Sequence, residues 1–287
     1  VTTPLDSTAP GILTTAWTSF LASLEPISGA ARLIGASTQL DGAGIGSIRL
    51  PWVTDVAGVG FVAEDQPIPI FRSTTSDVTM PLGCEIAAAF VVSNRLLAQS
   101  NAEAVFTTLL RRTIALTLDA EMFGTTAAVS SPTTSGRPGG LLNGLNAIPA
   151  AATMSEDFAN LADSLVTSGG DASVMYFASP GRVIAVQTRS PQPLPIYPSS
   201  RLSSARLVAI CPTALFTALG VPTIDITKEA TVNLSNTPLE LVDTGGAVAH
   251  PVSSLWQTAA TGIMVTLAAS WALANPNLAA FTDVSAW

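Results

Sequence analysis

The stretch SNAEAVFTTLLRRTIALTLDAEMFG, residues 100–124, decides the fold of this chain. Ser100 and Asn101 are candidate N-caps, and Gly124 suits the residue that follows a helix end. The apolar residues recur at steps of three and four along one broad face: Val105, Phe106, Leu109, Leu110, Ile114 and Leu118. About 22 helical residues at 1.5 Å each span roughly 33 Å, which is long for a globular domain. We therefore expect a strut helix over about residues 101–123.

The sequence before this helix predicts β-structure. Short apolar strand patterns are separated by Gly, Pro and Asp, and together residues 48–93 predict a long hairpin. Its middle contains GFVAEDQPIP, residues 60–69, which is too polar and proline-rich to form a core. Proline lacks the N–H that a sheet ladder needs, so this segment is neither helix nor central strand.

The sequence after the helix predicts mixed elements. A turn-dense loop, SGRPGGLLNGL at residues 135–145, leads to a helix over residues 155–166 that Ser155 is expected to cap. Residues 174–177 then predict a strand, followed by a helix with Ser179 as its N-cap and Pro180 as its first residue.

An uncharged apolar run at residues 253–278 raises the question of a membrane span. It carries no flanking Lys or Arg, so the usual topology signal is missing. Thr, Ser and Gly interrupt it, and from Met264 to Trp271 two sets of residues alternate. Met264, Thr266, Ala268 and Ser270 form one set, and Val265, Leu267, Ala269 and Trp271 form the other. We therefore expect a buried β-strand over residues 262–273 and no contact with a membrane.

The composition indicates self-association. Apolar residues make up 48% of the 287 residues and charged residues only 11%, so a lone subunit would be poorly protected against association. The net charge is −8, and no basic run is longer than Arg111–Arg112. Binding of nucleic acid through phosphate neutralisation needs a clustered basic surface, which this sequence lacks.

Residue types that carry chemistry are sparse. Cys84 and Cys211 lie in apolar contexts without metal or redox spacing, which predicts buried small side chains. His250 is the only histidine, and no G-x-S-x-G elbow supplies a nucleophile for it. We expect no catalytic residue, no cofactor and no metal site, so the sequence predicts a structural protein and not an enzyme.

The order of these features resembles the major capsid proteins of tailed phages with the Hong Kong 97 fold. The resemblance rests on VAEDQPIPIF, on RRTIALTLDAEMFG followed by GRPGGLLNGL, and on the apolar C-terminal segment, and it covers roughly residues 40–282. It implies an α+β fold with five named parts. These are an N-terminal arm (1–15), a peripheral domain (16–154 and 249–287) that includes an extended hairpin called the E-loop (about 50–80) and a spine helix (about 101–123), and an axial domain (155–248).

The resemblance also implies which residues contact a neighbouring subunit. In that family the E-loop lies across a neighbour, so its stiffness and charge would set the contact. The implied E-loop contact residues are Glu64, Asp65, Pro67, Pro69, Arg72 and Asp77. The implied spine-helix residues are Phe106, Leu110, Arg111, Arg112 and Ile114. The E-loop has no lysine, so the isopeptide crosslink that some members form from an E-loop lysine is not expected here.

The function that the resemblance implies is a viral structural role. The chain would self-assemble in the host cytoplasm into hexamers and pentamers of an icosahedral virion shell. This shell would enclose double-stranded DNA without reading its sequence. Cement or decoration, scaffold and portal proteins would be its partners. Two alternatives stay open: an encapsulin-type bacterial nanocompartment shell protein, and a secreted β-rich hydrolase.

Overall fold

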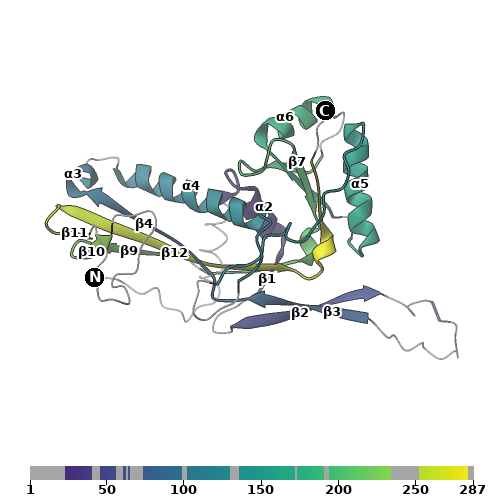
Figure 1. The fold of residues 1–287 in the computed structure, drawn as a ribbon, viewed down its shortest axis with the longest axis horizontal. Coiled ribbons are helices and arrows are strands. Elements are labelled where there is room, and N and C mark those ends of the chain that lie inside the picture. The colour runs from purple at the N-terminus through teal and green to yellow at the C-terminus, as the bar shows by residue number, and fades with distance from the viewer. Residues whose placement is uncertain are drawn as a thin grey trace, which may run out of the picture. The chain divides into compact units, whose positions relative to one another are not determined.

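The computed structural model describes residues 23–40, 46–55, 61–62, 64, 74–98, 102–129, 136–171, 173–190, 194–220, 222–233 and 252–283. The fold is α+β, as predicted, with several small sheets and few helices (Figure 1). The chain forms two compact units. The first consists of Val1–Glu85, Arg112–Val221 and Ala268–Trp287, and the second of Ile86–Arg111 and Pro222–Leu267. The expected arm, peripheral and axial boundaries remain a prediction.

A four-stranded sheet in the first unit is covered on one face by two helices. Its strands, in spatial order, are β13 (Ala279–Asp283), β7 (Arg206–Ile210), β5 (Met175–Ala178) and β6 (Ile196–Pro198). The helices are α5 (Met154–Thr167) and α6 (Pro180–Arg189). Tyr176 and Ala178 of β5 share one core with Leu161 of α5 and Val186 of α6. Because alternate strand residues point to opposite faces, Phe177 lies on the other face, where its ring packs 4.9 Å from that of Phe123.

The strand–cap–helix prediction is confirmed for α6, and the predicted cap of α5 is wrong. Ser179 is the N-cap of α6 and Pro180 is its first residue. Helix α5 is capped by Thr153 instead of Ser155, because Thr153 has the extended backbone of a cap and its hydroxyl accepts from the Glu156 N–H at 3.4 Å. Asp157, which is buried, reaches outside the helix and accepts from the Ala151 N–H at 2.7 Å.

Strand β12 (Ala260–Leu273) confirms the strand predicted at residues 262–273, and its two halves pair with different strands. Within the first unit, its C-terminal half pairs with β8 (Leu215–Leu219), which also pairs with β1 (Thr38–Gln39). Within the second unit, its N-terminal half pairs with β9 (Thr223–Thr227). Of the helices that the structure describes, none is long and apolar enough to cross a membrane.

Helix α4 (Ala102–Met122) confirms the predicted strut helix. Its C-terminal half is packed as expected, with Ile114, Leu118 and Met122 buried. In its N-terminal half, by contrast, Val105 and Leu109 are exposed although they belong to the same predicted apolar face. The remaining short elements are α2 (Gly29–Ala36), α3 (Asn94–Leu97), β10 (Thr231–Asn233), β11 (Val252–Ser254), η1 (Pro212–Ala214) and η2 (Pro276–Leu278).

The glycine-rich loop after α4 folds back onto the end of this helix. The Leu141 N–H donates to the Met122 carbonyl at 2.8 Å, and the Trp271 indole N–H donates to the Gly139 carbonyl at 2.9 Å. A Cβ at Gly140 would lie 2.1 Å from the carbonyl oxygen of Gly124, so only glycine fits at this position. The close approach of the two backbones explains the P-G-G motif.

Asp119, near the end of α4, is a fully buried carboxylate that joins three segments. Its Oδ1 accepts from the Ser28 hydroxyl at 2.5 Å and from the Ala30 N–H at 2.9 Å, both at the start of α2. Its Oδ2 accepts from the Ser199 hydroxyl at 2.6 Å, just after β6. All three donors are buried with it, so the carboxylate holds α4, α2 and the end of β6 together.

We expect Asp119→Ala to destabilise the first unit strongly. The substitution leaves buried donors at Ser28, Ala30 and Ser199 without their acceptor, and each such loss costs about 1–3 kcal/mol. Thermal unfolding followed by circular dichroism should therefore show a melting temperature many degrees below that of the wild type. Glu121→Ala is the matched control, because Glu121 makes only a 3.8 Å ion pair with Arg137 and is partly exposed. Equal melting temperatures for the two variants would contradict the role of Asp119.

Candidate intersubunit surfaces

The predicted hairpin is present but ends earlier than expected. Strands β2 (Ser47–Asp55) and β3 (Thr74–Pro81) pair antiparallel and form a ribbon of their own (Figure 1). β4 (Glu85–Ser93) does not continue this hairpin, so the prediction of one hairpin over residues 48–93 is wrong in its last part. β4 pairs with β12 instead. Gly83, with a φ of +78°, allows the turn that redirects the chain between β3 and β4.

The base of the hairpin is anchored in the first unit, and the residue pair Pro51 and Asp77, just beyond the base, is exposed. Leu50 of β2 and Met80 of β3 are buried and pack with Ala218 of β8. Pro51 and Asp77, which pair with each other in the next part of the ribbon, are both exposed. The hairpin therefore has a core at its base and none at Pro51 and Asp77.

Asp77 lies in an ion pair that the sequence did not reveal. The Arg49 guanidinium lies 3.8 Å from the Asp77 carboxylate, and the two side chains are 81% and 63% exposed. An exposed pair of this kind adds little stability because water and salt screen it. The two residues lie on opposite strands, and only the register of β2 against β3 brings them together.

The other predicted hairpin contacts are only partly described. Glu64 is exposed. Asp65, Pro67, Pro69 and Arg72 lie outside the described residues. The intersubunit role of all six predicted hairpin residues remains a prediction.

The five predicted spine-helix residues occupy three environments on α4. Ile114 is buried in the core. Phe106 and Leu110 are half-buried, and the Phe106 ring stacks on that of Phe90 at 5.7 Å. Arg111 and Arg112 are exposed, and neither makes an ion pair within the described part of the chain. Of the five predicted spine-helix residues, these two arginines are the ones whose exposed side chains another molecule could contact.

The second unit exposes apolar side chains that the sequence analysis missed. Strand β9 is exposed along its whole length, including Ile224 and Ile226. Trp256 is exposed in the turn between β11 and β12. This turn includes Ala259, a non-glycine residue with a φ of +48°. A strand pattern alone does not distinguish an edge strand such as β9 from a buried strand.

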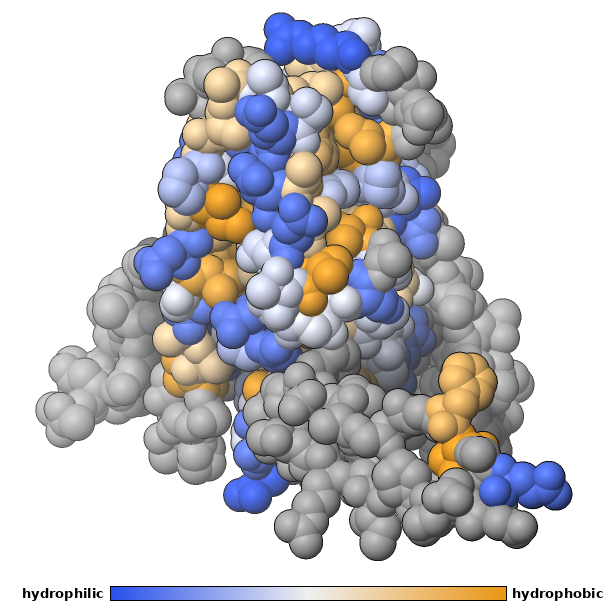
Figure 2. Space-filling model, turned by 90° about the vertical axis from the view of Figure 1, so that its right-hand side faces the viewer, coloured by the Kyte–Doolittle hydropathy of each residue, from blue (hydrophilic) through white to orange (hydrophobic). Residues whose placement is uncertain are grey.

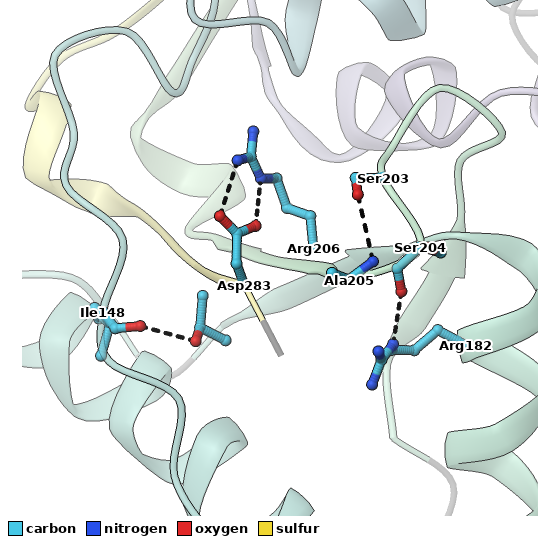
Figure 3. Close-up of polar contacts among 8 residues, drawn as sticks. Ile148, Arg182, Ser203, Ser204, Ala205, Arg206 and Asp283 are labelled. Carbon is cyan, nitrogen blue, oxygen red and sulfur yellow. Dashed lines mark hydrogen bonds and ion pairs between the residues drawn. The ribbon is translucent and has the colours of Figure 1, made fainter. Parts of the chain in front are cut away.

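A cluster of polar contacts lies at one end of the four-stranded sheet (Figure 3). Arg206 donates two hydrogen bonds to the carboxylate of Asp283, at 2.8 and 3.0 Å, from neighbouring antiparallel strands. Its guanidinium also lies 4.6 Å from the centre of the Phe281 ring. The hydrogen bonds from Arg206 lower the pKa of the Asp283 carboxyl below its usual range, and the same bonds raise the pKa of Arg206.

The same cluster ties down the loop before β7 (Figure 3). The Arg182 Nε–H donates to the Ser204 carbonyl at 2.9 Å, which joins the first turn of α6 to this loop. The Ala205 N–H donates to the Ser203 hydroxyl at 3.4 Å. These contacts give the exposed residues of the loop a defined position.

The two cysteines lie in different buried environments. Cys84 and Cys211 are buried, as predicted. Burial raises the pKa of the Cys84 thiol. The Cys211 thiol donates to the Asp171 carboxylate at 3.1 Å, which lowers the pKa of Asp171. Among the described residues no group of His, Cys, Asp or Glu could hold a metal ion, and His250 lies outside them.

We expect the Arg206–Asp283 pair to stabilise the fold in a pH-dependent way. The pKa of Asp283 is lower in the folded chain than in the unfolded chain, so the stabilisation is present above about pH 4 and is lost as the pH falls through the depressed folded-state value. Asp283→Asn should therefore reduce stability at pH 7 by roughly 0.5–1 kcal/mol, the size expected for a partly exposed pair. This difference from the wild type should shrink toward pH 3 in thermal melts. Asp225→Asn, at an exposed aspartate of β9, is the control, and a difference for Asp283→Asn that stays constant with pH would refute the prediction.

Comparison with known proteins identifies the fold. No protein-family model matches the chain. No curated protein matches it either. A solved chain of Mycobacterium phage Adephagia matches with a TM-score of 0.62 and 15% identity, over 88% of this chain and 89% of that one. A chain of Microbacterium phage Oxtober96 matches with a TM-score of 0.61 and 12% identity, over 99% and 95%. A chain from the capsid of an empty GTA particle matches with a TM-score of 0.57 and 13% identity, also over 99% and 95%. The chain therefore has the fold of solved phage-particle chains, including that of a GTA capsid.

Proposed function

We propose that this chain is a major capsid protein of a tailed phage, with the Hong Kong 97 type of fold. It assembles into hexamers and pentamers of an icosahedral shell that encloses double-stranded DNA. The observation that carries the proposal is the match of 99% of this chain to 95% of a GTA capsid chain, with a TM-score of 0.57. A match over almost the whole of both chains supports a shared role as a shell subunit more strongly than a match of one domain would.

The hairpin supports this proposal physically. Its base is packed in its own chain at Leu50 and Met80, while Pro51 and Asp77 further out have no core of their own. An arm with this distribution of burial gains stability when it docks on another surface. We propose that it is an E-loop that lies across a neighbouring subunit, with Glu64, Asp65, Pro67, Pro69, Arg72 and Asp77 among its contact residues and Arg49 added to them.

The other parts of the chain take their roles from the same proposal. Helix α4 is the spine of a peripheral domain over residues 16–154 and 249–287, and residues 1–15 form an arm. The sheet of β5, β6 and β7 with α5 and α6 belongs to an axial domain over residues 155–248, whose loops meet around the centres of hexamers and pentamers. Scaffold, portal and cement or decoration proteins are the proposed partners of the shell, which assembles in the host cytoplasm.

Electron microscopy of the purified chain tests the proposal. Negative-stain images with mass photometry should show shells, or rings of five and six subunits, and the absorbance at 260 nm should reveal DNA in any shells that formed in cells. Shells that contain a protein cargo instead of DNA would contradict the phage role and favour a nanocompartment. A chain that stays monomeric across protein concentrations and salt conditions would contradict a shell role of either kind.

Shortening the hairpin should abolish assembly without unfolding the subunit. Asp55 pairs with Thr74, so replacing residues 56–73 by Asn-Gly closes the ribbon with a two-residue turn. We expect the melting temperature of this variant to stay within a few degrees of the wild type, because the hairpin is anchored at its base. Shells and rings should be lost in negative-stain images.

Met80→Ala is the matched control, because it disturbs the packing at the hairpin base and leaves the length of the hairpin unchanged. Met80 is fully buried, so this substitution should cost about 2–5 kcal/mol of stability and lower the melting temperature. A shortened variant that assembles as well as the wild type would contradict the role of the hairpin, while leaving the shell role of the chain intact.

A further inference from the structure

Asn143 and Gly144 place an electrophilic side-chain amide beside an unhindered backbone nitrogen. Asn143 is the only asparagine in the chain that a glycine follows. When the backbone nitrogen of the next residue attacks the Cγ of an asparagine, a succinimide ring closes. A side chain on that next residue hinders the attack, and glycine has none. The sequence therefore makes Asn143 the asparagine most open to ring closure with its own backbone.

The turn that holds this pair leaves both reacting groups free. Asn143 and Gly144 are exposed, and neither the Asn143 side chain nor the Gly144 N–H makes a hydrogen bond with the described part of the chain. Gly144 has a φ of +75°, and a Cβ on it would meet no atom within 4 Å. The hydrogen bond that closes the turn, from the Leu145 N–H to the Leu142 carbonyl, is long at 3.4 Å. The Asn143–Gly144 peptide can therefore rotate toward ring closure without displacing a neighbour.

The other asparagines in the described ranges lack this combination. The Oδ1 of Asn94 accepts from the Thr261 hydroxyl at 2.5 Å, and the Nδ2 of Asn275 donates to the Ser168 carbonyl at 3.1 Å. Asn146 is exposed in the same loop as Asn143, but an alanine follows it. Asn146 is thus the matched internal reference, because it shares the loop and the solvent and differs in the residue that follows.

We propose that Asn143–Gly144 is a self-modification site, at which the chain deamidates without an enzyme. The Gly144 nitrogen forms a bond to the Asn143 Cγ, and the bond from Cγ to the side-chain nitrogen breaks. That nitrogen leaves as ammonia, with the proton that the Gly144 N–H gives up. Water then adds to either carbonyl of the ring and breaks the bond from that carbonyl to the ring nitrogen, which leaves aspartate or isoaspartate. Water is the only co-reactant, and no group is oxidised or reduced.

Isoaspartate lengthens a stretch of backbone that is fixed on both sides. Before the turn, Leu142 is fully buried, and its N–H donates to the Gly124 carbonyl at 3.3 Å. After the turn, the Ile148 N–H donates to the Phe281 carbonyl at 2.8 Å. In isoaspartate the backbone runs through the former side chain and gains a methylene carbon between these two anchors. The turn must then bulge or one anchor must shift, so this product should weaken the packing at the end of α4.

Aspartate, the other product, changes the charge and leaves the length of the backbone as it was. It adds one negative charge to a chain whose net charge is already −8. Hydrophilic side chains are spread over the described surface, as Figure 2 shows for one face of the molecule. A further charge at an exposed position of such a surface changes stability little. Isoaspartate is therefore the product with the larger structural effect.

Ageing the purified full-length chain in water labelled with heavy oxygen tests the site. The chain is held at physiological temperature and mildly basic pH, digested in ordinary water, and analysed by mass spectrometry with fragmentation that separates residue 143 from Asn146. The product at residue 143 should carry one labelled oxygen, and in ordinary water its mass should rise by about 1 Da. We expect residue 143 to be converted roughly 10-fold faster than Asn146, because no side chain hinders the Gly144 nitrogen.

A synthetic peptide of residues 138–148 gives the rate of the same reaction without the fold. Conversion of the chain within about 10-fold of the peptide's rate supports the site, since the turn leaves the Gly144 nitrogen unhindered. Conversion much slower than in the peptide would show that the fold protects Asn143, and would overturn the inference. Labelling at residue 143 that does not exceed the labelling at Asn146 would overturn it as well.

Asn143→Gln is the matched variant for the effect on stability. It keeps an amide at this exposed position, but its longer side chain would have to close a larger ring, so it should stay unlabelled. The aged wild type should melt a few degrees below the fresh wild type, whereas Asn143→Gln should melt at the same temperature before and after ageing. A fresh Asn143→Asp variant should melt like the fresh wild type, which assigns the loss to isoaspartate. Equal melting temperatures of the aged wild type and the aged Asn143→Gln variant would overturn the effect on the loop.

The modification site and the proposed shell function fail independently. The reaction takes place within one chain and needs no second copy. A chain that never assembles would overturn the shell function and leave the site standing. An aged chain that assembles while residue 143 stays unlabelled would overturn the site and leave the shell function standing.

Discussion

The buried carboxylate of Asp119 is the interaction on which the first unit depends. It sits at the point where the long helix α4 ends and accepts hydrogen bonds from Ser28, Ala30 and Ser199. A buried charge is costly unless its hydrogen-bonding capacity is filled, so the position of α4 and the positions of these three donors are coupled. The glycine-rich loop then packs onto the same end of α4, where Gly140 lies against Gly124. One end of the helix is therefore fixed by a polar network and by close backbone contact together.

Away from Asp119, several elements of the chain expose surfaces that no described residue covers. The hairpin has a core at its base and none at Pro51 and Asp77, β9 is exposed along its whole length, and exposed charges on α5 and α6 lack ion-pair partners within the described part of the chain. A chain with 48% apolar and 11% charged residues has few means of keeping such surfaces in water as a monomer. Under the proposed shell function, the low charge and the exposed surfaces have one common physical explanation, which is that neighbouring copies cover what the single chain exposes. The proposed shell is the assembly that provides those copies.

Several elements could be predicted because their signals are local. The helix α4 follows from apolar spacing, strand β12 from alternation, and the step from β5 into α6 from Ser179 and Pro180. Predictions failed where the answer depends on distant parts of the chain. The sequence pattern continued the hairpin into β4, but β4 pairs with β12, far along the chain. Thr153 and Ser155 are both good cap residues, and the structure has Thr153 as the cap.

The candidate surfaces were less predictable than the fold for the same reason. Helical spacing groups Val105 and Leu109 with Ile114, but burial depends on what lies over each turn, and only the last of them is covered. In the sequence, Asp119 looks like an ordinary charged residue of a helix. Its buried role could not be predicted, because its three donors come from segments about 90 and 80 residues away in sequence. Arg49 and Asp77 meet only through strand register. The hairpin residues Asp65, Pro67, Pro69 and Arg72 stay predictions drawn from resemblance alone.

Hydrogen–deuterium exchange on the free and the assembled chain tests most directly whether neighbouring copies complete the subunit. The account predicts that amides of the outer hairpin, at residues 51–55 and 74–77, exchange rapidly in the free chain and become strongly protected in the particle. The buried amides around Asp119 should be protected in both states and serve as the internal reference. Outer-hairpin amides that are equally protected in both states, or equally unprotected, would contradict the claim that this arm is stabilised by another copy of the chain.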